Sequence, residues 1–286
     1  MKIEVVSHVI STLGEGPIYL PQEKKVCWVD ILGKAWLAHD MNSGKTTKHQ
    51  LPEIIGALAP REYGDFIGAV KNGFAKFDSS GRYSLVHNFL ADSERMNDAK
   101  CDALGRFWAG STEMEFKKGQ GNLYRLNNDL TFELILSGFT LPNGLGWSPD
   151  NSIFYLVDSY EKALWSFDFQ LATGQIRNQK LMFDFSGMAG LPDGICVASD
   201  GTIFVAMWDG SNIAVITRDG DLKDLIRLPV SRPTSCTFGG NRNADLLITT
   251  ASLELDLDKE PLSGKLLAIK NLNYIGLESM KYRELI

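Results

Sequence analysis

Two kinds of hydrophobic segment are missing from this 286-residue sequence. No stretch approaches the 18 consecutive apolar residues that a membrane-spanning helix needs. The first eight residues carry Glu4 within their only apolar run, so they lack the apolar core of a signal peptide. We therefore expect a cytoplasmic protein that is not anchored in a membrane.

Sequence motifs for several kinds of chemistry are also absent. The four cysteines, Cys27, Cys101, Cys196 and Cys236, lie far apart and form no CxxC pair, which excludes a zinc knuckle and a thioredoxin-type redox motif. We expect them to be buried thiols. The sequence has no GxxxxGK[ST] phosphate loop and no GxGxxG that opens a helix.

Positive charge is in short supply. The chain has 29 Lys and Arg against 35 Asp and Glu, a net charge of −6. Such a chain repels phosphate backbones and anionic lipid, so neither a nucleic acid nor a membrane is an expected partner. A cation or a small neutral molecule fits this charge better.

The residues that are present indicate an all-β protein. The chain is 44% hydrophobic and 10% aromatic, which is enough for a substantial core. Apolar residues rarely recur at the helical spacing of 3.6, whereas short runs of β-branched and aromatic residues alternate with Gly, Asp, Asn and Pro turns.

A repeat of 40 to 50 residues organises these strands. Its six first-strand segments begin 40, 42, 46, 50 and 41 residues apart, at Glu15, Ile55, Asn97, Asn143, Asp193 and Thr234. Second, third and mostly fourth strands follow each of them, which is typical of a β-propeller blade.

We therefore predict a six-bladed β-propeller that forms one domain over residues 1–286. The sixth unit lacks an obvious fourth strand, and residues 3–9 have the character to supply it and close the ring. A β-sandwich or two smaller β-domains are the alternatives, but neither requires a six-fold repeat.

The first position of each repeat forms a predicted ring at the mouth of the central channel. Glu15, Asn97, Asn143 and Asp193 place two carboxylates and two amides there, and such hard oxygen donors suit calcium, magnesium or manganese. Asn-Gly and Asp-Gly alone can be ordinary turns, but their recurrence in one position favours a metal site.

Histidine takes no part in this predicted site. His8, His39, His49 and His87 fall in outer strands or turns, which argues against a Ser-His-Asp triad and a three-histidine zinc site.

Five groups of short motifs, in order along almost the whole chain, resemble the senescence marker protein 30 (regucalcin), gluconolactonase and luciferin-regenerating enzyme family. They are Leu13-Gly-Glu-Gly-Pro17 with Trp28-Val-Asp-Ile31, Arg95-Met-Asn-Asp98 with Asp102-Ala-Leu-Gly-Arg-Phe-Trp-Ala-Gly110, Leu141-Pro-Asn-Gly144 with Trp147-Ser-Pro-Asp150, Leu191-Pro-Asp-Gly194, and Arg232-Pro-Thr-Ser235 with Phe238-Gly-Gly240.

The resemblance implies a six-bladed propeller whose divalent metal is held by Glu15, Asn143 and Asp193. It also implies that Arg95 and Asn97 bind substrate, together with a glutamate that spacing places at Glu115, with Glu113 as the competing choice. The sequence departs from the family at Asn97-Asp-Ala-Lys100 and Ala109-Gly-Ser-Thr112, which bears on substrate detail more than on metal binding.

These features predict divalent-metal-dependent hydrolysis of a sugar lactone. The metal would be calcium first, with zinc, magnesium or manganese as alternatives. Asp193 or the ion itself would activate the attacking water. A metal-dependent phosphotriesterase or arylesterase and a non-catalytic calcium-binding propeller are the rival functions. We expect a monomer or a weak homodimer.

Overall fold

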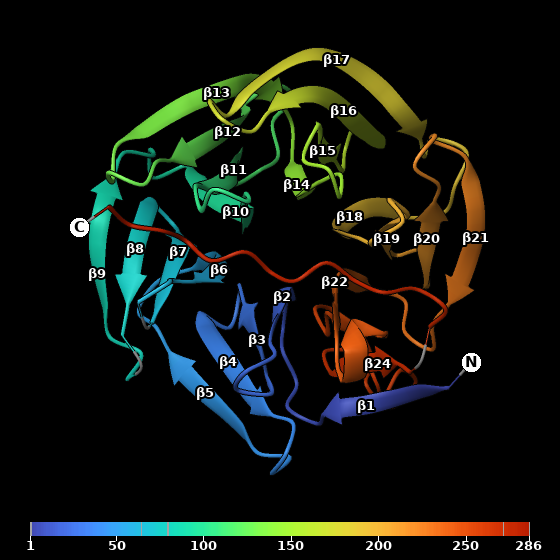
Figure 1. Cartoon of the computed structure of the whole chain (residues 1–286). Helices are drawn as coiled ribbons and strands as arrows, with labels where there is room; N and C mark the ends of the chain where they lie inside the picture. Colours follow the sequence, from blue (N-terminus) through green and yellow to red (C-terminus); the bar gives the residue numbers. More distant parts are fainter. Residues whose placement is uncertain (1, 64, 79, 271, 286) are drawn as a thin grey trace.

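The computed structural model describes residues 2–63, 65–78, 80–270 and 272–285, and it is a six-bladed β-propeller (Figure 1). Each blade is a four-stranded antiparallel sheet, which confirms the predicted fold. Among the described residues the only helical segment is the 3-10 turn Asn241–Asn243. No helix in those ranges is long and apolar enough to cross a membrane.

The first three blades follow one another along the chain, each with its innermost strand first. They are β2 (Gly14–Leu20), β3 (Lys25–Asp30), β4 (Ala35–Asp40) and β5 (Thr46–Gln50); β6 (Ile55–Pro60), β7 (Phe66–Val70), β8 (Gly73–Phe77) and β9 (Tyr83–Asn88); and β10 (Glu94–Cys101), β11 (Phe107–Glu113), β12 (Gly121–Leu126) and β13 (Phe132–Phe139).

The last three blades complete the circle. They are β14 (Pro142–Trp147), β15 (Ile153–Asp158), β16 (Ala163–Gln170) and β17 (Gln175–Asp184); β18 (Leu191–Val197), β19 (Ile203–Trp208), β20 (Asn212–Ile216) and β21 (Leu222–Arg227); and β22 (Pro233–Gly239), β23 (Asp245–Thr250), β24 (Leu266–Ile269) and β1 (Ile3–Ser7).

The N-terminal strand completes the sixth blade, as the sequence predicts. β1 lies antiparallel to β24, with Ile3 opposite Ile269 and Val5 opposite Leu267. The two ends of the propeller are thereby joined in one sheet (Figure 1). This pairing covers the strand edge that β24 would otherwise leave open.

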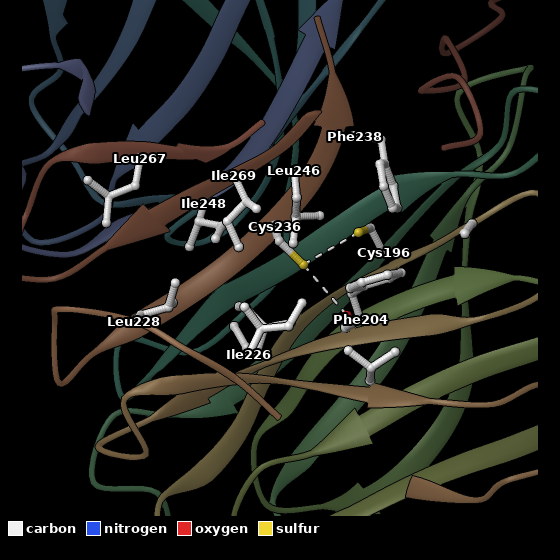
Figure 2. Close-up of a cluster of buried hydrophobic side chains, with 14 of the residues drawn as sticks. Cys196, Phe204, Ile226, Leu228, Cys236, Phe238, Leu246, Ile248, Leu267 and Ile269 are labelled. Carbon is white, nitrogen blue, oxygen red and sulfur yellow. Dashed lines mark hydrogen bonds between the residues drawn. The ribbon is translucent and has the colours of Figure 1, made fainter. Parts of the chain in front are cut away.

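Apolar side chains between neighbouring blades form the core. Figure 2 shows one such cluster, where Phe204 of blade 5 meets Phe238 of blade 6 edge to face, with ring centroids 5.2 Å apart. Cys196 and Cys236 lie in this cluster with their Sγ atoms 3.4 Å apart. All four cysteines are buried free thiols, as expected.

A β-bulge interrupts the innermost strand of every blade at the position of the predicted ring. In β2, for example, three steps from Glu15 to Ile18 face only two steps from Val29 to Cys27 on β3. The same one-residue excess occurs in β6, β10, β14, β18 and β22. A bulge changes the direction of the side chains beside it. Because every blade has the bulge, the six ring residues occupy equivalent positions in their blades.

The C-terminal segment 272–285 forms a strap across the face of the propeller opposite the ring (Figure 1). Ile275 accepts a hydrogen bond from Ser199 in blade 5 (2.8 Å), and Tyr282 donates one to Pro60 in blade 2 (2.8 Å). Both partners lie near the ends of innermost strands, whereas the ring lies near their beginnings. The strap lines a cavity of about 150 Å³ at this end of the channel.

Candidate functional site

Glu15, Asn143 and Asp193 occupy equivalent bulge positions on β2, β14 and β18. Each is buried, with 6% of its surface exposed. The structure therefore brings the three predicted metal ligands to one end of the central channel.

The glycines after two of these ligands explain the Asn-Gly and Asp-Gly pairs. Gly144 and Gly194 lie within strands rather than turns. A Cβ atom on Gly144 would stand 2.5 Å from the Asp193 carbonyl oxygen, and one on Gly194 would stand 2.1 Å from Ser235 Oγ. Only glycine allows the innermost strands to approach this closely.

Two oxygen atoms of this set are buried without a hydrogen-bond partner among the described residues, namely Asn143 Oδ1 and Asp193 Oδ1. Asn143 is fixed through its other atom, since Nδ2 donates to Ser159 Oγ at 3.1 Å. An unpaired buried polar group costs roughly 1–3 kcal/mol. These two oxygens are therefore available to a ligand.

The carboxylates of this site repel one another. Burial raises the pKa of Asp193 well above its ordinary value, and the charge of Asp98 raises it further, while hydrogen bonding with Asn143 and Glu15 lowers it. Burial likewise raises the pKa of Glu15, and the charges of Asp193 and Asp98 add to this effect. A bound cation would offset this concentration of negative charge.

Asp98 is a third buried carboxylate that the sequence analysis did not assign. Its Oδ1 accepts a hydrogen bond from the Ala99 backbone at 2.7 Å, and its Oδ2 has no partner in the described part of the chain. Comparison of the repeats could have revealed it. The residue after the ring position is aspartate in blade 3, whereas it is glycine in four other blades, at Gly16, Gly56, Gly144 and Gly194.

Asn97 lies in the ring position of β10, and its side chain is hydrogen-bonded at both ends. Its Oδ1 accepts a hydrogen bond from Arg95 Nη1 at 2.7 Å, and its Nδ2 donates to the Pro142 carbonyl at 3.0 Å. Burial lowers the pKa of Arg95 to about 10, against the opposing charges of Glu15 and Asp193, so the guanidinium remains charged at neutral pH. Arg95 thus holds Asn97 beside the three candidate ligands.

Glu113 and Glu115 differ sharply in their surroundings. The side chain of Glu113, at the end of β11, is 4% exposed, and its Oε1 accepts a hydrogen bond from Lys117 Nζ at 3.0 Å. The side chain of Glu115 is 77% exposed and contacts the same ammonium at 3.2 Å. Glu113 is the last residue of β11 and Glu115 lies in the loop after it, so both are on the same face as the ring.

Two further residues support the site and had no motif to reveal them. The buried carboxylate of Asp158 accepts hydrogen bonds from the Thr140 and Leu141 backbone at 2.8 and 3.1 Å, which fixes the chain just before Asn143. Ser159, the next residue, accepts the hydrogen bond from Asn143. The ring residue of blade 6, Thr234, connects strands instead. Its hydroxyl forms hydrogen bonds with Thr249 Oγ1 at 2.9 Å and with the Gly14 carbonyl.

The donor set fits one hard divalent cation. No group of three or more His, Cys, Asp or Glu side chains within the described ranges is arranged to hold a metal. The candidate set is of another composition, with two carboxylates and an amide oxygen, and its unpaired Oδ1 atoms are the donors that calcium or magnesium prefers.

Comparisons with known proteins agree with this architecture. Residues 13–252 match the model of the SMP-30/Gluconolactonase/LRE-like region. Regucalcin of Danio rerio is 29% identical over 290 residues, which cover 99% of this chain and 98% of the relative. A Bacillus subtilis protein named as a sugar lactone lactonase is 31% identical over 250 residues, covering 86% and 85%.

A solved structure gives the same result in three dimensions. The regucalcin of Agrobacterium tumefaciens, described as a calcium-binding protein, superposes with a TM-score of 0.93 at 25% identity and covers 98% of this chain and 96% of its own.

Proposed function

The chain belongs to the SMP-30/gluconolactonase/LRE-like family, and on that premise we propose that it is a divalent-metal-dependent lactonase that hydrolyses a sugar lactone. The observation that carries this proposal is the buried set of Glu15, Asn143 and Asp193, in which two oxygens lack a partner among the residues that the structure describes. The name of the Bacillus subtilis relative supports the substrate class, and the description of the Agrobacterium protein supports calcium.

In the proposed reaction, the oxygen of a water molecule bonds to the lactone carbonyl carbon. The bond from that carbon to the ring oxygen breaks, and the ring oxygen takes up a proton, so the product is a hydroxy acid. A divalent cation bound by Glu15, Asn143 and Asp193 would supply Lewis acidity toward the carbonyl oxygen.

Asp193 is the proposed acceptor of the proton of the attacking water. Burial among other carboxylates makes it more basic than an exposed aspartate. A nearby cation acts in the opposite direction, so the role requires that one carboxylate oxygen stays free of the metal.

Arg95, Asn97 and Glu115 are the proposed contacts to the sugar hydroxyl groups. Arg95 fixes the Asn97 amide through the bond of 2.7 Å, so the amide has one orientation before substrate arrives. Such preorganisation lowers the entropic cost of substrate binding. Glu113 is the alternative to Glu115, because the same lysine contacts both carboxylates.

A substrate panel tests the proposal. Metal-stripped protein is assayed with glucono-, galactono-, xylono- and arabinonolactone, alone and after addition of calcium, zinc, magnesium or manganese. We expect hydrolysis above the buffer rate only with metal. No turnover of any lactone with any metal would refute the lactonase function, and turnover of a phosphotriester or aryl ester in its place would support the rival hydrolases.

A further inference from the structure

Large apolar side chains are exposed around the same face of the propeller as the candidate site. Met114 in the loop after β11 is 41% exposed, and Tyr160 in the loop after β15 is 48% exposed. Both loops join the second strand of a blade to the third, in neighbouring blades 3 and 4. Hydrolysis of a lactone ring does not require exposed Met and Tyr side chains on this face.

Phe116 and Tyr160 connect these two loops. Their ring centroids are 5.3 Å apart, with an angle of 32° between the planes. Phe116 has a φ of 57°, a left-handed conformation that is rare for a bulky residue, and its amide donates to the Glu113 carbonyl at 2.9 Å. An ion pair of 3.0 Å between Lys118 and Glu161 joins the same loops.

The two rings are continuous with the candidate site along the chain. Tyr160 directly follows Ser159, which accepts the hydrogen bond from Asn143. Phe116 lies three residues after the buried Glu113. The start of the loop that bears Tyr160 is anchored, because Asp158 at the end of β15 accepts two backbone hydrogen bonds from the segment that leads into β14.

We propose that Phe116 and Tyr160 form an aromatic wall of the substrate site, and that this wall favours lactones with an apolar substituent on the ring. The inference rests on the proposed lactonase function and adds a specificity to it. An aromatic pair fixed at the mouth of a site offers a flat apolar surface to a substituent that points away from the reacting carbonyl. The hydrolysis itself is unchanged: water adds to the carbonyl carbon and the ring carbon–oxygen bond breaks.

A matched pair of lactones tests the wall. δ-Valerolactone and δ-decalactone share the reacting ring and differ by a pentyl chain. We expect wild-type kcat/KM to be roughly 10-fold higher for δ-decalactone, mainly through a lower KM, since burial of a few methylene groups commonly gives such a factor. In Phe116→Ser and Tyr160→Ser the ratio of the two kcat/KM values should fall to about 1–3.

Two control variants sharpen the test. Tyr160→Phe retains the ring and should keep the wild-type ratio. Leu225→Ser removes an apolar side chain from β21 that is 41% exposed, against 48% for Tyr160, and should also keep the wild-type ratio. Both substrates are measured on one sample of each variant, so a misfolded fraction cancels from the ratio.

Three results would overturn the inference. They are a wild-type ratio near 1, a ratio that the two serine variants leave unchanged, and a ratio that Leu225→Ser lowers as much as they do. Glucono-δ-lactone is measured alongside on the wild-type protein. If it is hydrolysed while the ratio is near 1, the wall is refuted and the lactonase function stands; if no lactone is hydrolysed, the proposed function has failed.

Discussion

At the scale of single residues, the site is defined by which polar atoms the protein leaves without partners. Asn97 and Thr234 occupy ring positions, but their oxygens are engaged by Arg95 and by backbone or threonine partners. Asn143 and Asp193 each keep one buried oxygen without a partner in the described part of the chain. Glu15, whose Oε2 accepts a hydrogen bond from the Gly16 backbone at 3.0 Å, is the third metal ligand in our proposal.

The roles of Glu113 and Glu115 can be separated by paired substitutions. If Glu115 contacts a sugar hydroxyl, Glu115→Gln should raise KM for the preferred lactone roughly 10-fold, because a charged hydrogen bond is replaced by a weaker one. Glu113→Gln should then leave KM within about twofold. Steady-state kinetics of the two variants decide the matter, and the reverse pattern would assign the role to Glu113.

At the scale of strands and segments, the bulge and the glycine after it set the geometry of the site. Gly144→Ala should move β14 away from β18, because the new Cβ has only 2.5 Å to the Asp193 carbonyl oxygen and to the Ile195 nitrogen. We expect a loss of about 2 kcal/mol or more in the free energy of unfolding.

Gly144→Ala should also lower the rate of lactone hydrolysis by more than the loss of folded protein would explain. Gly187→Ala is the matched control, since a Cβ there meets no atom within 4 Å. Denaturant melts and kinetics of both variants test this, and equal behaviour of the two would show that close strand approach does not matter.

The strap contributes stability from the face away from the site. Tyr282 is fully buried, its hydroxyl donates to the Asn127 carbonyl at 2.6 Å, and Glu284 pairs with Arg61 at 2.6 Å and with Lys76 at 2.5 Å. Tyr282→Ala should lower the free energy of unfolding by about 3–5 kcal/mol. Turnover at a temperature where the variant is folded should be close to wild type; a large loss of kcat would contradict the separation of strap and site.

Sequence reasoning could find the strands but not the strap. The repeat leaves one blade a strand short, and an unassigned apolar segment at the start of the chain supplies β1. Residues 272–285 have no period because they form no blade, and their burial depends on contacts with turns up to 223 positions away, such as Arg61 with Glu284. Asp98 was missed because no motif marks it. It stands out only when its position is compared with the glycines at the same position of other blades.

At the scale of the whole molecule, the repeat concentrates negative charge at one end of the channel. The chain carries a net charge of −6, and the buried Glu15, Asp98 and Asp193 lie together with Arg95. A divalent cation bound among them would offset the charge of the two proposed carboxylate ligands. One face therefore carries the polar site, and the strap crosses the other (Figure 1).

This charge predicts how stability depends on pH. In metal-free protein the pKa values of Glu15 and Asp193 are raised, so the unfolded chain loses its protons first as pH rises. The free energy of unfolding should therefore fall above about pH 4.5, by up to about 1.4 kcal/mol per pH unit for each group, until the raised pKa is passed.

Thermal melts of metal-free wild type and Asp193→Asn between pH 5 and 8 measure this effect. The wild type should lose more stability with rising pH than the variant, and excess calcium should restore it. Parallel curves would contradict the raised pKa of Asp193.

The most direct test of the account is a calcium titration of metal-stripped protein. Calorimetry measures the calcium bound at each step, and the initial rate of lactone hydrolysis is measured in the same buffer. We predict one site per chain, with the rate rising in proportion to its occupancy. Asp193→Asn and Glu15→Gln should bind calcium at least about 10-fold more weakly and lose at least about 100-fold in kcat. A rate that is independent of metal, or calcium binding that both variants leave unchanged, would contradict the assignment of this site.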